Sequence, residues 1–149
     1  AKERFWTAVY HTAGEKYQLA AVSTVDKYTM LCQNAIELKN IDSFKKHGNY
    51  VYRIGLDRVP DEIDSLRGKF GYFFEYDADD INSIAHIINT KYQTLTYYGV
   101  NKSELVNFVI INRLSGIDRI VPVGKALDMD VIWDGYDIVR SLSRIIDVK

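Results

Sequence analysis

Strand-like and helix-like segments alternate along the second half of this 149-residue chain, and this alternation constrains its fold most strongly. The aromatic run 71–76 is typical of a strand covered on both faces. A helix with an apolar stripe is expected from residue 79, followed by a strand over 93–99. The expected elements that remain are a helix capped by Asn101 with Glu104, a short strand at 118–123 and a closing helix at 134–147. This order favours an α/β fold with an open, mostly parallel sheet flanked by helices, with an α+β arrangement as the alternative.

The first half of the sequence predicts two amphipathic helices and one more strand. Apolar residues recur at helical spacing and predict a helix over about residues 2–19. Ser23 and Asp26 have the spacing of a capping box. Residues 49–54 alternate as a strand does, and with only two prolines the chain is expected to form a single domain over residues 1–149. The second helix is expected to carry one apolar face, made of Val25, Tyr28, Cys32, Ala35 and Ile36.

Charge and composition exclude several classes of function. Lys and Arg total 19 against 20 Asp and Glu, so there is no basic excess to bind a phosphate backbone, and no nucleic acid is expected as a partner. The longest apolar runs, 19–22 and 108–111, are far too short to span a bilayer. A single cysteine precludes an internal disulfide and a cysteine-rich zinc site, which favours a reducing compartment and predicts a cytoplasmic location.

Few side chains stand in a pattern that supports catalysis. Cys32 lies within a predicted helix with no histidine one turn away, so we expect it to pack in the core and not to act as a nucleophile. The three histidines lack metal-ligand spacing, and the acidic residues of segment 77–80 stand where a helix needs a cap. No phosphate-binding glycine motif is present. We therefore expect no catalytic residue, no metal site and no bound cofactor in this chain.

The row Trp133, Asp134, Gly135 and Tyr136 has two interpretations. In the first, Asp134 is the N-cap of the closing helix, Asp137 is its N3 acid, and Trp133 packs on the first turn. This interpretation explains every residue type except the need for tryptophan. In the second, Trp133, Asp134 and Gly135 form part of a site.

The C-terminal stretch 116–147 resembles the signature of the acyl-CoA reductase family typified by the bioluminescence fatty-acid reductase (LuxC). The match comprises a Gly-x-x-Arg-Ile-Val-Pro-x-Gly block, a spacer, Trp-Asp-Gly and a closing Leu-Ser-Arg helix, over about a fifth of the chain. Segment 92–99 extends a weaker match upstream. The residues that carry the resemblance are Gly116, Arg119, Ile120, Val121, Pro122, Gly124, Trp133, Asp134, Gly135, Leu142, Ser143 and Arg144.

This family is similar to the aldehyde dehydrogenase superfamily, and the resemblance implies that residues 1–149 are the C-terminal part of such a catalytic domain. Its members are expected to use NADPH to reduce a fatty acyl-CoA, or an acyl group from an acyl-protein synthetase partner, to a long-chain aldehyde. The reaction passes through a thioester on a cysteine upstream of this segment. The chain alone is therefore expected to be inactive, and the whole enzyme is expected to be a homo-oligomer. By the same resemblance Trp133, Asp134 and Gly135 face the acyl pocket or a neighbouring subunit.

Phe70 is the one cofactor-binding candidate that the resemblance offers. Phe70 and Gly71 align with the Glu-x-Phe-Gly segment that lines the nicotinamide ribose in aldehyde dehydrogenases. Gly68 stands at the position of the glutamate, so the carboxylate of that segment is missing here.

A second class of function remains open. Eleven tyrosines are many for this length, and an excess of aromatic residues also fits a surface that meets another protein. The alternative to the reductase is therefore a non-catalytic protein-interaction or oligomerisation module.

Overall fold

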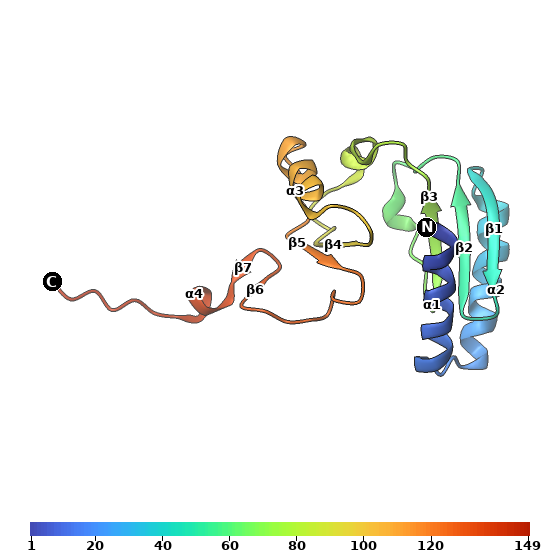
Figure 1. The fold of residues 1–149 in the computed structure, drawn as a ribbon, viewed down its shortest axis with the longest axis horizontal. Coiled ribbons are helices and arrows are strands. Elements are labelled where there is room, and N and C mark those ends of the chain that lie inside the picture. Colours follow the sequence, from blue (N-terminus) through green and yellow to red (C-terminus); the bar gives the residue numbers. More distant parts are fainter. The chain divides into compact units, whose positions relative to one another are not determined.

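The computed structural model describes all residues, 1–149, and the chain divides into two compact units, Ala1–Asp77 and Ala78–Lys149 (Figure 1). The expectation of a single domain over the whole chain stays a prediction. No helix is long and apolar enough to cross a membrane.

The first unit consists of two helices and a three-stranded sheet. The sheet order is β1-β2-β3, with β1 antiparallel to β2 and β2 parallel to β3. The crossover from β2 to β3 contains a short 3₁₀ helix, η1. The elements are α1 (Lys2–Lys16), α2 (Ala21–Glu37), β1 (Ile41–His47), β2 (Val51–Leu56), η1 (Ile63–Ser65) and β3 (Tyr72–Tyr76).

The two helices cover opposite faces of this sheet. Side chains alternate along β2, so neighbouring residues of this strand meet different helices. Tyr52 and Ile54 point to the face on which Met30 and Leu31 of α2 pack. Arg53 points to the other face, where its guanidinium carbon lies 4.9 Å from the centre of the Trp6 ring of α1. The central strand is therefore buried on both sides, as its pattern shows, whereas β1 at the edge is mostly exposed.

Helix α2 faces the sheet with a side that differs from the predicted one. It begins at Ala21 with Ala20 as N-cap and no side-chain cap, so the predicted capping box at Ser23 is wrong, and Ser23 is buried inside the helix. The expected apolar face is exposed to solvent, including Ile36 and the thiol-bearing Cys32, so the prediction that Cys32 packs in the core is also wrong. Polar contacts explain this orientation.

Those contacts come from Lys27 and Asn34 on the side of α2 that meets the sheet. The Lys27 ammonium, which is fully buried, donates to the carbonyl oxygens of Asn49 and Tyr50 in the turn between β1 and β2. Burial lowers the pKa of Lys27, and the nearby charge of Lys46 lowers it further. Asn34 Nδ2 donates to the Tyr72 hydroxyl at 2.8 Å. Buried turn carbonyls need donors, and α2 supplies one by turning its charged residue inward.

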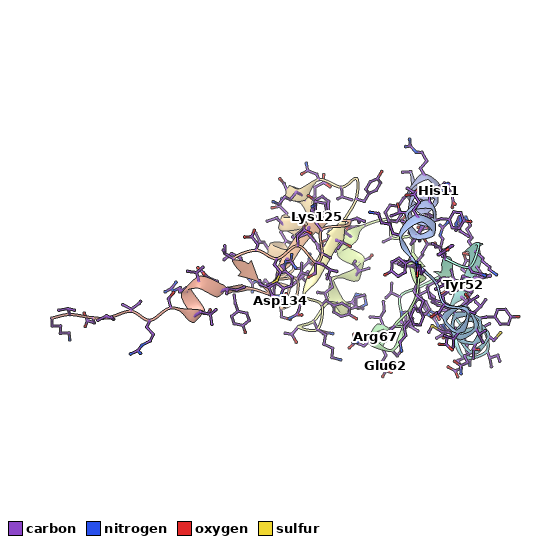
Figure 2. All side chains as sticks on the ribbon, turned by 90° about the horizontal axis from the view of Figure 1, so that it is seen from below. His11, Tyr52, Glu62, Arg67, Lys125 and Asp134 are labelled. Atoms are coloured by element: carbon purple, nitrogen blue, oxygen red, sulfur yellow. The ribbon has the colours of Figure 1, made fainter.

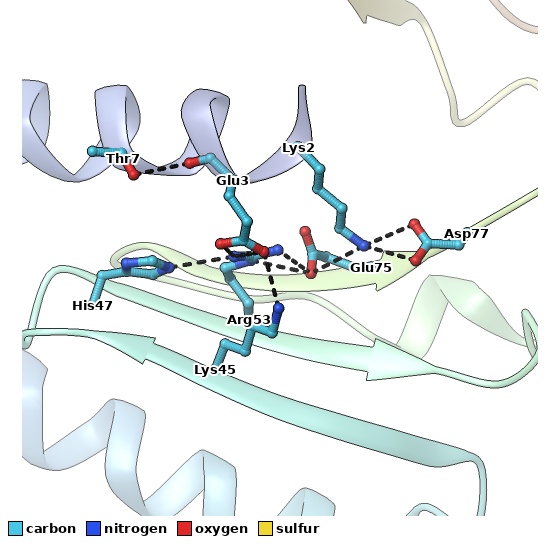
Figure 3. Close-up of polar contacts among 8 residues, drawn as sticks. All are labelled: Lys2, Glu3, Thr7, Lys45, His47, Arg53, Glu75 and Asp77. Atoms are coloured by element: carbon cyan, nitrogen blue, oxygen red, sulfur yellow. Dashed lines mark hydrogen bonds and ion pairs between the residues drawn. The ribbon is translucent and has the colours of Figure 1, made fainter.

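A group of charged side chains, the Arg53 network, ties α1 to the opposite face of the sheet (Figure 3). Arg53 has a side chain only 1% exposed. Its Nη1 donates to Glu3 Oε2 at 3.0 Å, and its Nε donates to Glu75 Oε2 at 3.1 Å. Hydrogen bonds from Lys45 and Arg53 lower the pKa of Glu3 from 4.5 to about 2. The network, drawn together with Thr7 in Figure 3, comprises Lys2, Glu3, Lys45, His47, Arg53, Glu75 and Asp77.

The second unit contains two small sheets. Strands β4 and β5 pair in parallel, and β6 and β7 pair antiparallel as a hairpin. Asn101 caps α3 as predicted, its side chain accepting from the Ser103 backbone N–H at 2.9 Å. Asp80 likewise caps the first element of this unit, which is a 3₁₀ helix. The elements are η2 (Ile81–Ile87), β4 (Thr94–Tyr97), α3 (Lys102–Ile111), β5 (Arg119–Pro122), β6 (Ile132–Trp133), β7 (Tyr136–Asp137) and α4 (Ile138–Leu142).

The fold is thus mixed α/β, as expected, with its strands in three small sheets. The strand β1 was not predicted. The closing helix is shorter than expected, covering Ile138–Leu142 where residues 134–147 were predicted. The apolar side chains that were predicted to point inward from it do not enter a core: Leu142, and Ile145 and Ile146 beyond its end, are all more than four-fifths exposed.

The burial of Arg53 makes a testable prediction about Glu75. Replacing Glu75 with Gln removes the charge that faces a guanidinium from which water is excluded, so Glu75→Gln is expected to lower the free energy of unfolding by about 2 kcal/mol. Asp77→Asn is the matched control, because Asp77 pairs with Lys2 in an exposed position and its loss should cost less than about 0.5 kcal/mol. Urea unfolding of both variants tests this, and equal midpoints would contradict it.

Candidate functional site: the Arg119–Trp133 corner

Residues 133–136 form a β-hairpin with a two-residue turn. Trp133 pairs with Tyr136 across it, and Asp134 and Gly135 at its tip have φ of 47° and 79°. Two consecutive positive φ values belong to the type I′ turn, for which Asp-Gly is a favoured sequence. The predicted role of Asp134 as a helix N-cap is therefore wrong. The N-cap of α4 is Asp137, whose Oδ1 accepts from the Arg140 backbone N–H at 2.9 Å.

Arg119, the first residue of β5, holds the hairpin and the preceding loop together. Its guanidinium carbon lies 4.1 Å from the centre of the Trp133 ring, within the range of a cation–π contact. Its Nη1 donates to the carbonyl oxygen of Ala126 at 3.0 Å, and its Nη2 donates to that of Asp128 at 2.9 Å. The Arg119 side chain thus joins β5, the loop at 126–128 and the hairpin, which are separate segments of the sequence. We call this arrangement the Arg119–Trp133 corner.

Two glycines of the signature are required by close approach of other atoms. A Cβ on Gly116 would lie 2.2 Å from the carbonyl oxygen of Asn89, so no larger residue fits there. A Cβ on Gly135 would lie 3.0 Å from Asp118 Oδ1, and its positive φ disfavours a side chain in any case. Gly116 lets β5 begin close to the segment before β4, and Gly135 lets the hairpin tip approach Asp118.

A hollow of about 520 Å³ lies beside Arg119. Lys102 and Arg119 line it together with Lys125 and Asp128, whose Nζ and Oδ2 lie 2.8 Å apart; this contact raises the pKa of Lys125. Lys125 and Asp134 are labelled in Figure 2. The hollow offers cations and carboxylates but no thiol or hydroxyl side chain, so by itself it is best suited to binding a polar group. Its other lining residues are Ile120, Val121, Met129, Asp130 and Ile132.

Trp133, Asp134 and Gly135 lie together in the hairpin. Phe70 lies in the other unit, where it has a φ of 54° and the next residue, Gly71, has a φ of 83°. The residues around Phe70 do not fit the nicotinamide cofactor. A Cβ on Gly68 would lie 1.8 Å from the carbonyl oxygen of Tyr72, so no carboxylate side chain can stand at that position. Phe70 instead lines an apolar cavity. No group of three or more His, Cys, Asp or Glu side chains is arranged to hold a metal ion.

Comparison with protein-family models, with curated proteins and with solved structures finds no match to this chain. Function is therefore inferred from the residues and their geometry. Sequence patterns pointed to Trp133, Asp134 and Gly135 but missed the stacking of Arg119 on Trp133. The signal for it was present: Arg119 opens an otherwise apolar strand, Ile120–Val121–Pro122.

The hairpin predicts a specific order of stability among variants at Asp134. Asp134→Asn and Asp134→Gly should preserve the turn, because both residues tolerate a left-handed conformation, whereas Asp134→Val should lose about 1 kcal/mol or more. The measurement is the cross-strand nuclear Overhauser effect between Trp133 and Tyr136, followed with temperature. If Asp134→Val keeps this contact as well as Asp134→Asn does, the left-handed turn is not what the sequence specifies.

Proposed function

We propose that this chain forms the C-terminal part of an NADPH-dependent acyl-CoA reductase. The substrate is a fatty acyl-CoA, or an acyl group passed on by an acyl-protein synthetase, and the product is a long-chain aldehyde. The observation that carries the proposal is the contact between Arg119 and Trp133. Arg119 and Trp133 belong to separate blocks of the signature that resembles the acyl-CoA reductase family. Their contact gives a physical reason why both blocks occur in one sequence.

The division of labour in this proposal follows from the side chains that the chain has. Cys32 is exposed on α2, well past the helix N-terminus that would favour a reactive thiolate, so the acyl-thioester is assigned to a cysteine elsewhere in the enzyme. Gly68 leaves no room for a ribose-binding carboxylate, so NADPH is assigned to other residues as well. The part of this chain is to shape and support the acyl site through the Arg119–Trp133 corner.

Two further expectations belong to this proposal. The whole catalytic domain is expected to contain the open, mostly parallel sheet of aldehyde dehydrogenase-like enzymes, and the parallel pairs β2–β3 and β4–β5 support it. The enzyme is expected to work in the cytoplasm, because a chain with one exposed cysteine and no disulfide suits a reducing compartment.

Exposed apolar side chains favour a second candidate function, a protein-interaction or oligomerisation module. Ile145 is 92% exposed, and further apolar residues that are more than half exposed occur from the loop before β6 to the end of the chain. A segment rich in exposed apolar residues is typical of a surface that meets another protein. For this candidate the partner is a second copy of the chain, as the expected homo-oligomer requires. The exposed residues are Leu127, Met129, Val131, Tyr136, Val139, Leu142, Ile145, Ile146 and Val148.

The reductase proposal is tested in a full-length protein that contains this segment. Acyl-CoA-dependent oxidation of NADPH is expected, and Arg119→Met should lower kcat/KM at least tenfold, about 1.4 kcal/mol in transition-state stabilisation, because the loop and Trp133 lose their common contact. Arg140→Met is the matched control, since its side chain is exposed on α4, and it should leave kcat/KM unchanged. A full-length protein that oxidises NADPH neither with acyl-CoA nor with an acyl-protein synthetase would overturn the proposal.

Self-association tests the second candidate separately. Sedimentation velocity of the chain is expected to show a concentration-dependent dimer that Ile145→Asp abolishes, because a charge would enter the apolar interface. Ser141→Asp adds the same charge at an exposed polar position and should leave the dimer intact. A chain that stays monomeric at every concentration rules out the homo-oligomer through this surface.

A further inference from the structure

An apolar cavity of about 170 Å³ lies in the first unit, beside the C-terminal half of α1. The helix contributes Val9 and Ala13 to its wall, Tyr17 follows at the helix end, and the sheet contributes Val51, which is 1% exposed, and Phe73. None of the lining residues carries a charge. The remaining lining residues are Leu19, Tyr50, Phe70 and Gly71.

A strained segment holds an aromatic ring at this cavity. Phe70 has φ of 54°, a left-handed conformation that is a genuine outlier for a bulky residue. The next residue, Gly71, has φ of 83°, and a Cβ there would lie 2.1 Å from the carbonyl oxygen of Tyr50, so the backbone at this point has little freedom. Backbone strain of this kind persists where the surrounding structure maintains it, and it clusters at ligand clamps. Phe70 is also half exposed, so its ring stands between the cavity and solvent.

The size and lining of the cavity select the ligand. An engineered protein cavity of about 150 Å³ lined by Leu, Ile and Phe stays dry and binds benzene, so the present volume holds a group of about six carbon atoms. An ion or a polar group would lose its hydration here without gaining a charged partner, which excludes it. The cavity is too small to seat more than one apolar group, which distinguishes it from a broad protein-docking face.

We propose that this cavity is a binding site for the hydrocarbon end of a small uncharged molecule, with Phe70 closing over it. The site is independent of the Arg119–Trp133 corner and does not rest on the proposed reductase function. The polar end of the ligand would remain at the rim, where Tyr17 is two-thirds exposed.

The test uses n-hexanol as the probe and methyl NMR of the whole chain as the measurement. Addition of n-hexanol is expected to shift the methyl signals of Val9, Leu19 and Val51 saturably. The same concentrations of 1,6-hexanediol, which is polar at both ends, should shift them at least tenfold less. Equal shifts with both alcohols, or shifts that never saturate, would overturn the proposal.

Filling the cavity supplies the matched variants. Ala13→Phe places a ring inside the cavity and is expected to weaken n-hexanol binding at least tenfold, with Ala13→Leu as a second, smaller filler in case the first disturbs folding. Ala8→Phe is the control, because Ala8 lies on the exposed side of the same helix and outside the cavity wall. Undiminished binding in a folded Ala13→Leu or Ala13→Phe chain shows that the alcohol binds elsewhere, and the proposal is then wrong.

Discussion

The guanidinium of Arg53 is the constraint on which the first unit depends. It stands in the middle of the central strand, where its desolvation is costly unless carboxylates meet it. Glu75 on β3 and Glu3 on α1 provide them, so the buried charge requires the parallel neighbour strand on one side and the N-terminal helix above it. The same charge lies over Trp6, whose ring also packs on Phe73 of β3 and so joins the helix to the sheet by an apolar contact. A three-stranded sheet this small would otherwise have one face open to water.

In the second unit an arginine, Arg119, also joins several segments, but it donates to a different set of acceptors. Arg119 is met by the main-chain oxygens of Ala126 and Asp128 and by the face of Trp133. Neutral acceptors leave the charge of Arg119 uncompensated, unlike that of Arg53. A partly exposed guanidinium beside an open hollow still attracts an anionic group. In the Arg53 network, by contrast, carboxylates balance the cationic side chains. This difference is why the corner is the better candidate for a site and the network is part of the scaffold.

The sequence predicted elements whose local signals agree, and it failed where two local signals compete. Helix α3 was predicted well because Asn101 can only be its cap and the apolar residues follow at once. Asp134 and Asp137 are both capping residues three positions apart, and only the pairing of Trp133 with Tyr136 decides that the first belongs to a turn. The predicted orientation of α2 was wrong because Lys27 is buried to reach the carbonyl oxygens of Asn49 and Tyr50, which lie in a turn far along the sequence. For the site, Trp133, Asp134 and Gly135 were found by motif, but a contact across the spacer to Arg119 has no local pattern.

The Arg53 network also sets the order in which the first unit can be completed as it is synthesised. Helix α1 is made before the strands that it covers: Arg53 follows Glu3 by 50 residues, and Glu75 follows Arg53 by a further 22 residues. At a synthesis rate of roughly 10 residues per second, the helix waits for several seconds before the sheet face that it covers exists. During that time Trp6 and its neighbours have no surface on which to pack. Late closure of this kind makes the nascent helix dependent on the speed of translation and on whatever shields its apolar side as it leaves the ribosome.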